Sequence, residues 1–337
     1  MKNTANLNPS GYSPQLDGLR AFCIIFTIFN HIEGVPSWIN GGVGVDVFFV
    51  LSGFLITGIL IQGEGRKNFL KSFYIRRFFR IAPIYYFSFA LTALAALILD
   101  RKFGSSTKIN ELAASWQYII LFLGEYRPAT AGSFFGHSWT IGIEEKFYLI
   151  WPILFIFLLG NAISRVVFLC LFLVLIGNLG DMELRGYGGI AMGSIAATFI
   201  FHWKIKSVNT YFAFSMFVSA YIIQIFSPDF IFSISVAAAF LVPALYQNNC
   251  SLIAKILALP LFVWLGRLTF SIYMLHILCL NVVKIFFAKI EVDNWLIVFW
   301  VGYVLSVVVA WLSFRLIEYP LIVYGKRLAY TKTAVLA

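Results

Sequence analysis

Charged residues are scarce in this chain of 337 residues. They make up only 12% of it, whereas 61% of the residues are hydrophobic and the mean hydropathy is +0.87. A soluble globular domain typically carries about 25% charged residues. Apolar runs of roughly 15 to 25 residues, the length that a helix needs to cross a bilayer, recur from residue 19 to residue 317. The composition excludes an ordinary soluble fold and predicts an all-α, polytopic bundle of transmembrane helices with no separate soluble domain.

Cysteine is scarce as well. The four cysteines are Cys23, Cys170, Cys250 and Cys279, and each lies in or beside an apolar run. Their spacing fits neither a metal site nor a disulfide framework. We interpret all four as packing residues and expect no metal.

Two further features are missing. The net charge is +10, but the basic residues lie between apolar runs and not on a soluble module, so we expect no nucleic-acid partner. The N-terminal segment MKNTANLNPSGYSPQLDG lacks the pattern of a cleavable signal peptide. We therefore expect the first span to remain in the protein.

Apolar runs separated by charged breaks predict about ten membrane spans within one domain that covers residues 1–337. These spans lie near 19–34, 41–62, 81–99, 139–159, 165–179, 187–202, 208–226, 230–247, 260–287 and 293–317. A further apolar stretch at 116–124 is too short to cross about 30 Å as a helix. We expect a half-helix or a re-entrant segment there.

The distribution of positive charge predicts the orientation of the spans. The segment after the second span, EGRKNFLKSFYIRRFFR, is rich in Lys and Arg, which favours the cytoplasmic side. With about ten spans, the N-terminus and the C-terminus are then both cytoplasmic. The exception is RKFGSSTK at 101–108, which this topology places outside. We expect a multi-pass protein of the inner cell membrane.

Ionisable residues inside apolar runs are costly and usually face the interior of a helix bundle. Arg20 and His31 both lie in the first run, about three helical turns apart, so a continuous helix would carry them on one face. Asp46 enters the second span. After that span, Arg77 and Arg80 stand at i and i+3 and should face the same way.

Two more polar stripes stand at helical spacing. In HSWTIGIEEKFYLIWP, at 137–152, one helical face carries Thr140, Glu144 and Tyr148, and Glu145 is adjacent. In LGRLTFSIYMLH, at 265–276, one stripe carries Thr269, Tyr273 and His276. We interpret these side chains as supporting residues of a site.

A histidine such as His31 inside a span is as often a hydrogen-bonded packing residue as a reactive one. Here it is accompanied by carboxylates in another helix and by arginines toward the cytoplasm. That combination suits general-base chemistry on a hydroxyl, with an anionic donor held by the arginines. The same residues also suit a proton-coupled secondary transporter of an anionic solute, although no inverted repeat is evident.

Six motifs in order resemble acyltransferase family 3, a family of integral-membrane acyltransferases. The motifs are LDGLRAFCIIFTIFNH with Arg20 and His31, GVGVDVFFVLSGFLIT, IRRFFRIAPIYY with Arg77 and Arg80, HSWTIGIEEKFYLIWPIL, LGRLTFSIYMLH and FRLIEYP. The resemblance runs the length of the chain. It implies transfer of an acyl group, usually acetyl, from cytoplasmic acyl-CoA to a hydroxyl on a carbohydrate or glycolipid acceptor, with acetyl-CoA as a co-substrate and no bound cofactor.

The resemblance also implies roles for individual residues. His31 would be the catalytic base or a transient acyl carrier, and Arg20, Arg77 and Arg80 would bind the CoA phosphates. Glu144 would orient or assist His31, so we expect the partner of His31 to be a carboxylate from 137–152.

The chain departs from the family pattern at three positions of this block. Thr140 stands where Ser is usual, Gly142 replaces another Ser, and Lys146 stands where Gln is common. The chain also ends shortly after the last span, so we expect no fused SGNH esterase-like domain.

Overall fold

The structure is a computed structural model that describes residues 12–104, 106–179, 184–227, 230 and 232–331. The two chain ends, whose cytoplasmic location the sequence predicts, lie outside the described residues.

The α-helices are α1 (Pro14–Phe29), α2 (Gly42–Gly63), α3 (Phe69–Phe103), α4 (Thr107–Ile120), α5 (Trp139–Ile153), α6 (Ala162–Leu179), α7 (Leu184–Ala197), α8 (Thr210–Phe226), α9 (Ser233–Gln247), α10 (Leu252–Leu257), α11 (Pro260–Lys289), α12 (Trp295–Ser313) and α13 (Tyr319–Thr331). The short helical segments are η1 (Gly124–Tyr126), η2 (Ala129–Ala131), η3 (Gly136–Ser138), η4 (Leu154–Leu158), η5 (Thr198–His202) and η6 (Phe314–Glu318). Within the described ranges, all regular structure is helical.

The protein is a membrane protein by the length and composition of its helices. Four helical stretches are long and apolar enough to cross a bilayer: Gly42–Gly63, Phe69–Lys102, Pro260–Lys289 and Trp295–Ala329. Shorter apolar helices cover Ala162–Gly177, Thr210–Phe226 and Ser233–Gln247. Helices dominate because every backbone N–H and C=O in a bilayer must find its partner within the protein.

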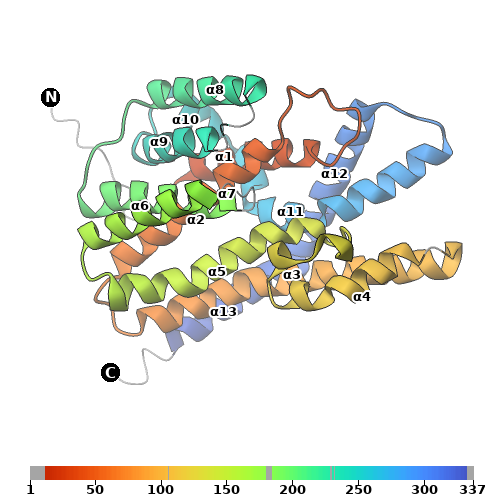
Figure 1. The fold of residues 1–337 in the computed structure, drawn as a ribbon, viewed down its shortest axis with the longest axis horizontal. Coiled ribbons are helices and arrows are strands. Elements are labelled where there is room, and N and C mark those ends of the chain that lie inside the picture. The colour runs from red at the N-terminus through yellow and green to blue at the C-terminus, as the bar shows by residue number, and fades with distance from the viewer. Residues whose placement is uncertain (1–11, 105, 180–183, 228–229, 231, 332–337) are drawn as a thin grey trace.

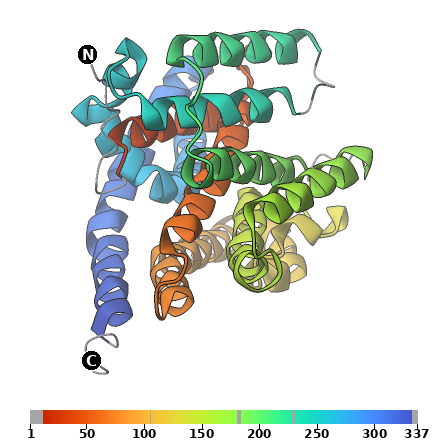
Figure 2. The ribbon, with the colours of Figure 1, turned by 90° about the vertical axis from the view of Figure 1, so that its left-hand side faces the viewer.

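Three groups of helices can be distinguished in space. Figure 1 shows α3, α5 and α13 along one side, α8, α9 and α10 along the other, and α1, α2, α7 and α11 between them. The view from the side in Figure 2 shows the same order. The candidate site lies where α1, α2 and α11 of the middle group meet α3 and α5.

Small residues bring the middle helices together. A Cβ atom on Gly53 of α2 would lie 2.0 Å from the carbonyl oxygen of Ile190 in α7. A Cβ atom on Gly44 would lie 2.2 Å from the carbonyl oxygen of Cys23 in α1. Any larger residue at these two positions would push the helices apart, as expected for close helix packing in membranes.

Helices α1 and α11 lie side by side and run in the same direction. Near the start of both, the guanidinium of Arg267 donates to the hydroxyl of Tyr12 at 3.0 Å. Beyond the end of α1, Nζ of Lys284 lies 3.4 Å from Oε1 of Glu33. The residue just before α1 therefore lies beside the first part of α11, and the turn after α1 lies beside a later part of α11.

The end of α1 corrects one expectation. The apolar run at 19–34 predicts a helix that contains His31, but α1 ends at Phe29 and His31 lies in the turn that follows. The side chain of Asn30 accepts a hydrogen bond from the backbone N–H of Gly41, and Gly34 has a φ of +79°. These two features turn the chain away from helical geometry.

The stretch at 116–124, expected to be a half-helix or a re-entrant segment, is the end of a short helix and the turn after it. That helix is α4, which begins at Thr107 and ends at Ile120. At 14 residues, α4 is about 21 Å long. It is too short to cross about 30 Å of hydrocarbon.

Candidate active site

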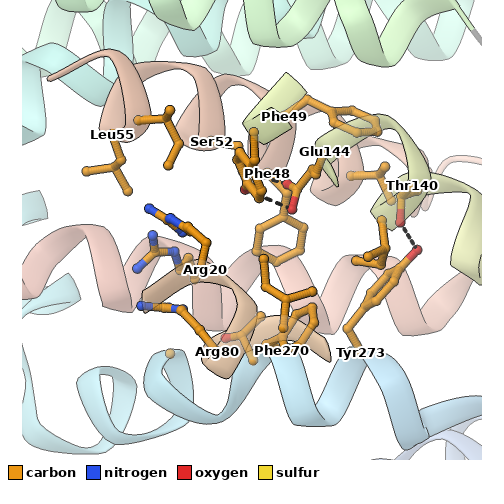
Figure 3. A pocket seen from close by; sticks show the side chains of 18 of the residues that line it. Arg20, Phe48, Phe49, Ser52, Leu55, Arg80, Thr140, Glu144, Phe270 and Tyr273 are labelled. Atoms are coloured by element: carbon orange, nitrogen blue, oxygen red, sulfur yellow. Dashed lines mark hydrogen bonds between the residues drawn. The ribbon is translucent and has the colours of Figure 1, made fainter. Parts of the chain in front are cut away.

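A cavity of about 240 Å³ lies between α1, α2, α3, α5 and α11. Figure 3 shows Arg20 and Arg80 on one side of it, Thr140 and Tyr273 on the other, and Glu144 between them. The polar side chains that line the cavity are Arg20, Ser52, Arg77, Arg80, Thr140, Glu144, Tyr148, Arg267, Thr269 and Tyr273. The cavity thus has an arginine end, defined by Arg20, Arg77, Arg80 and Arg267, and an opposite end defined by Thr140 and Tyr273.

The arginine end is held by few contacts. Nη1 of Arg20 lies 2.6 Å from Oδ1 of Asp17, one turn earlier on α1. The guanidinium of Arg77 lies over the ring of Tyr148, 5.0 Å from its centroid. The guanidinium of Arg267 donates to the hydroxyl of Tyr12, which lies just before α1. Four guanidinium groups against few carboxylates make this end strongly positive, which favours a multiply charged anion.

The carboxylate of Glu144 lies midway along the cavity. It accepts hydrogen bonds from the hydroxyls of Ser52, at 2.5 Å, and Tyr148, at 3.0 Å. Glu144 and Tyr148 meet because they stand at i and i+4 on α5, as their spacing predicts. Glu145 does not line the cavity, and its Oε1 is buried with no hydrogen-bond partner among the described residues.

The opposite end is closed by a hydroxyl pair. The hydroxyl oxygens of Thr140 and Tyr273 lie 2.7 Å apart. The Tyr273 hydroxyl also donates to the carbonyl oxygen of His137 at 2.8 Å. These contacts join the start of α5 to α11.

Behind this hydroxyl pair, three histidine rings meet, and we call them the histidine cluster. The ring centroids of His31 and His276 lie 5.0 Å apart, and those of His276 and His137 lie 5.4 Å apart. The ring of Tyr273 lies 5.6 Å from both His137 and His276. The cavity and the histidine cluster are therefore in contact through one tyrosine.

The structure brings most of the predicted residues together, but His31 differs from its prediction in two ways. His31 is half-buried and does not line the cavity itself. No hydrogen bond or ion pair between described residues joins it to Glu144 or Glu145, and its nearest ring is His276. An imidazole ring, and not a carboxylate, thus lies beside His31.

Asp46 lies outside the cavity. It is fully buried, and its Oδ1 lies 2.9 Å from Nε of Arg185. This pair joins α2 to α7, so Asp46 supports the bundle from a distance.

Sequence comparison identifies the family of the chain. The profile of a family described as an acyltransferase domain matches residues 13–315. The chain belongs to acyltransferase family 3. Its membership agrees with the six motifs in order along the sequence.

Relatives within the family are longer than this chain. The O-acetyltransferase OatA of Staphylococcus aureus (strain NCTC 8325 / PS 47) is 29% identical over 354 residues, which cover 92% of this chain and 57% of OatA. The putative peptidoglycan O-acetyltransferase YrhL of Bacillus subtilis (strain 168) is 27% identical over 362 residues, which cover 94% of this chain and 56% of YrhL. The chain therefore spans little more than half the length of these relatives. No solved structure matches the chain.

Two departures from the family pattern share one structural cause. Lys146 forms an ion pair with Glu125, which is 6% exposed. A Cβ atom added to Gly142 would lie 2.5 Å from Oε2 of Glu125, so a serine at this position would collide with this carboxylate. Gly142 makes room for Glu125, and Lys146 neutralises it.

The sequence prediction missed three residues of the site. His137 opens the motif that contains Glu144, and its position in that motif was the available signal. Arg267 is an arginine inside an apolar run, a costly feature that marks it as functional. Ser52 carries no charge and no periodic signal, so only the structure identifies it.

Proposed function

We propose that this protein is a membrane-bound O-acyltransferase that moves an acyl group, most simply acetyl, from cytoplasmic acyl-CoA to a hydroxyl of a cell-surface or exported glycan. Membership of the family and relatives that are named O-acetyltransferases support this function. The observation that carries it is one cavity with four arginines at one end and hydroxyls backed by histidines at the other.

The arginine end suits the nucleotide part of acyl-CoA. A planar guanidinium matches two phosphate oxygens at once, and several of them can spread over neighbouring phosphate groups. Arg20, Arg77 and Arg80 would hold the phosphates, and Arg267 adds a fourth contact. Acyl-CoA in this role is a substrate, and the thioester end would extend toward Tyr273.

The histidine cluster suits the chemical step. A ring nitrogen of His31 takes the proton of the acceptor hydroxyl, whose oxygen then attacks the thioester carbonyl carbon. The C–S bond breaks, and the CoA thiolate leaves and takes up the proton. A thioester is already activated, so positioning and one base supply what the reaction needs. Glu144 would hold the side chains of Ser52 and Tyr148 in the cavity wall by hydrogen bonds. Its effect on His31 would be indirect, through the shape of the cavity.

We also propose one membrane domain of about ten spans over residues 1–337, with both termini in the cytoplasm, in the inner cell membrane. The basic segment 64–80 supports this orientation because it contains Arg77 and Arg80 at the arginine end. That end would then face the compartment that supplies acyl-CoA. The side chains of Glu33 and Lys284 would mark the opposite side, where an exported acceptor could reach His31.

The proposal is tested with membranes that carry the full chain and acetyl-CoA radiolabelled in the acetyl group. The wild-type protein should release CoA and leave label on a glycan fraction. His31→Ala should slow both by about 1000-fold, because a general base contributes on that scale. Equal rates for the wild type and His31→Ala would contradict the proposal. Uptake of an intact labelled anion without release of CoA would favour a transporter.

A further inference from the structure

The histidine cluster contains three of the four histidines of the chain, and only one of the three has a role so far. His276 lies between the other two rings and is completely buried. The contacts of His276 determine which of its two ring nitrogens carries the proton.

The backbone fixes the tautomer of His276. Its Nδ1 lies 2.6 Å from the carbonyl oxygen of Tyr273, one turn earlier on α11. A carbonyl oxygen can only accept, so Nδ1 must carry the proton. In a neutral imidazole the other nitrogen, Nε2, is then an acceptor. That Nε2 is buried and has no hydrogen-bond partner among the described residues.

His31 is placed to supply the missing donor. An N–H···N hydrogen bond of about 3 Å between two imidazoles puts their ring centroids about 5 Å apart. The centroids of His31 and His276 are 5.0 Å apart, but no hydrogen bond joins the two rings in the structure, so the His31 ring must turn to form one. The ring of His137 is also near, at 5.4 Å from His276, but it is buried. His31 lies in a turn beyond α1 and is only half-buried, so its ring can reorient more freely than that of His137.

We propose that His276 is a positioning residue for His31. Its Nε2 accepts a hydrogen bond from one ring N–H of His31, which leaves the lone pair of the other ring nitrogen directed toward the acceptor hydroxyl. This inference rests on the proposed function of His31 as the base. It assigns to a neutral imidazole the orienting task that a carboxylate performs in many hydrolases.

A neutral orienting group has a chemical consequence. A carboxylate would stabilise the imidazolium formed when His31 takes the hydroxyl proton, whereas the imidazole of His276 stabilises it less. The proton therefore passes on readily to the departing thiolate. No additional reactant is needed, since the proton lost by the hydroxyl is the one gained by CoA.

Three substitutions of His276 test the acceptor Nε2 separately from the rest of the imidazole ring. His276→Gln keeps an acceptor near the position of Nε2, His276→Asn keeps only a donor near Nδ1, and His276→Phe keeps neither. We expect Gln to retain at least a tenth of the wild-type kcat. Asn and Phe should lower kcat by about 100-fold, with the KM for acetyl-CoA within about twofold. His202→Gln, an exposed histidine outside the cluster, serves as the control and should change nothing.

Equal kcat values for the Gln and Asn variants would overturn the inference, because a purely structural role would not distinguish them. A second measurement does not depend on the folding of any variant at this position. Nitrogen NMR of isotope-labelled histidine in the wild-type protein should show His276 protonated at Nδ1 and a hydrogen-bonded ring N–H on His31. Protonation of His276 at Nε2, or a hydrogen-bonded N–H on His137 in place of His31, would contradict it.

The two proposals fail in different ways. If His31→Ala retains full activity, the proposed function is wrong. If His31→Ala is inactive while all three His276 variants keep the wild-type kcat, the function stands and only the positioning role of His276 is wrong.

Discussion

The two ends of the cavity are built differently. At the arginine end, Arg80 and Arg267 are exposed, and Arg20 and Arg77 are partly exposed. At the other end, His137, Tyr273 and His276 are each no more than 8% exposed and are fixed by hydrogen bonds to the backbone or by packed rings.

This difference is the one expected for a binding end and a reacting end. An anion that enters and leaves needs charged groups that remain hydrated until it arrives, since burying unpaired guanidinium groups would be costly. A base needs rigid neighbours that orient it toward a bound hydroxyl, because small displacements reduce the rate greatly. Substitutions at the arginine end should therefore change KM, and those at the histidine end should change kcat.

Arg77→Ala gives the largest effect on binding. Loss of one charge-assisted hydrogen bond to a phosphate should raise the KM for acetyl-CoA about tenfold or more, with kcat little changed. Steady-state kinetics across donor concentrations measure both constants. An acetyl-CoA that lacks its ribose phosphate should bind more weakly to the wild type for the same reason.

The matched control is Arg66→Ala, an exposed arginine of the same basic segment that does not line the cavity. It should leave KM unchanged. A fall in kcat for Arg77→Ala at constant KM would contradict the assignment of the arginine end to binding and of the histidine end to the chemical step.

Tyr273→Phe tests the reacting end. It removes the hydroxyl that contacts Thr140 and the carbonyl oxygen of His137, but it keeps the backbone carbonyl that holds His276. Two neutral hydrogen bonds are lost, so kcat should fall about tenfold while KM stays constant. Tyr303→Phe is the control, because the Tyr303 hydroxyl is buried and has no hydrogen-bond partner among the described residues. A higher KM for Tyr273→Phe would place the tyrosine in donor binding.

Lys146→Gln should affect neither end and should give the smallest change in activity. It leaves the carboxylate of Glu125 buried without its cation, which should lower the free energy of unfolding by about 3 kcal/mol. Adding Glu125→Gln removes the unpaired charge and should restore most of that stability. Thermal unfolding in detergent of the two single variants and the double variant measures the coupling. Additive losses would show that the two side chains do not act as a pair.

The sequence was sufficient where local spacing determines structure. The second apolar run at 41–62 became α2 with nearly the same ends, Gly42 and Gly63, because a charged segment bounds it. Arg77 and Arg80 both reach the cavity, as their i, i+3 spacing on one helix predicts.

It was insufficient where distant segments meet. The end of α1 depends on a hydrogen bond between the Asn30 side chain and Gly41, which no periodic pattern reveals. The contact between the rings of His31 and His276 joins residues that are far apart in the sequence. The sequence marked each histidine separately, and the family resemblance implied a carboxylate as the partner of His31. Only packing in three dimensions brings the two rings together.

The most direct test of the account is a cryo-electron microscopy structure of the protein with an acetyl-CoA analogue in which a methylene group replaces the sulfur. We predict phosphate density within hydrogen-bond distance of Arg77 and Arg80, and the acetyl group beside Tyr273. Density for the nucleotide away from the arginine end, or an acetyl group directed away from Tyr273 and His31, would contradict the account.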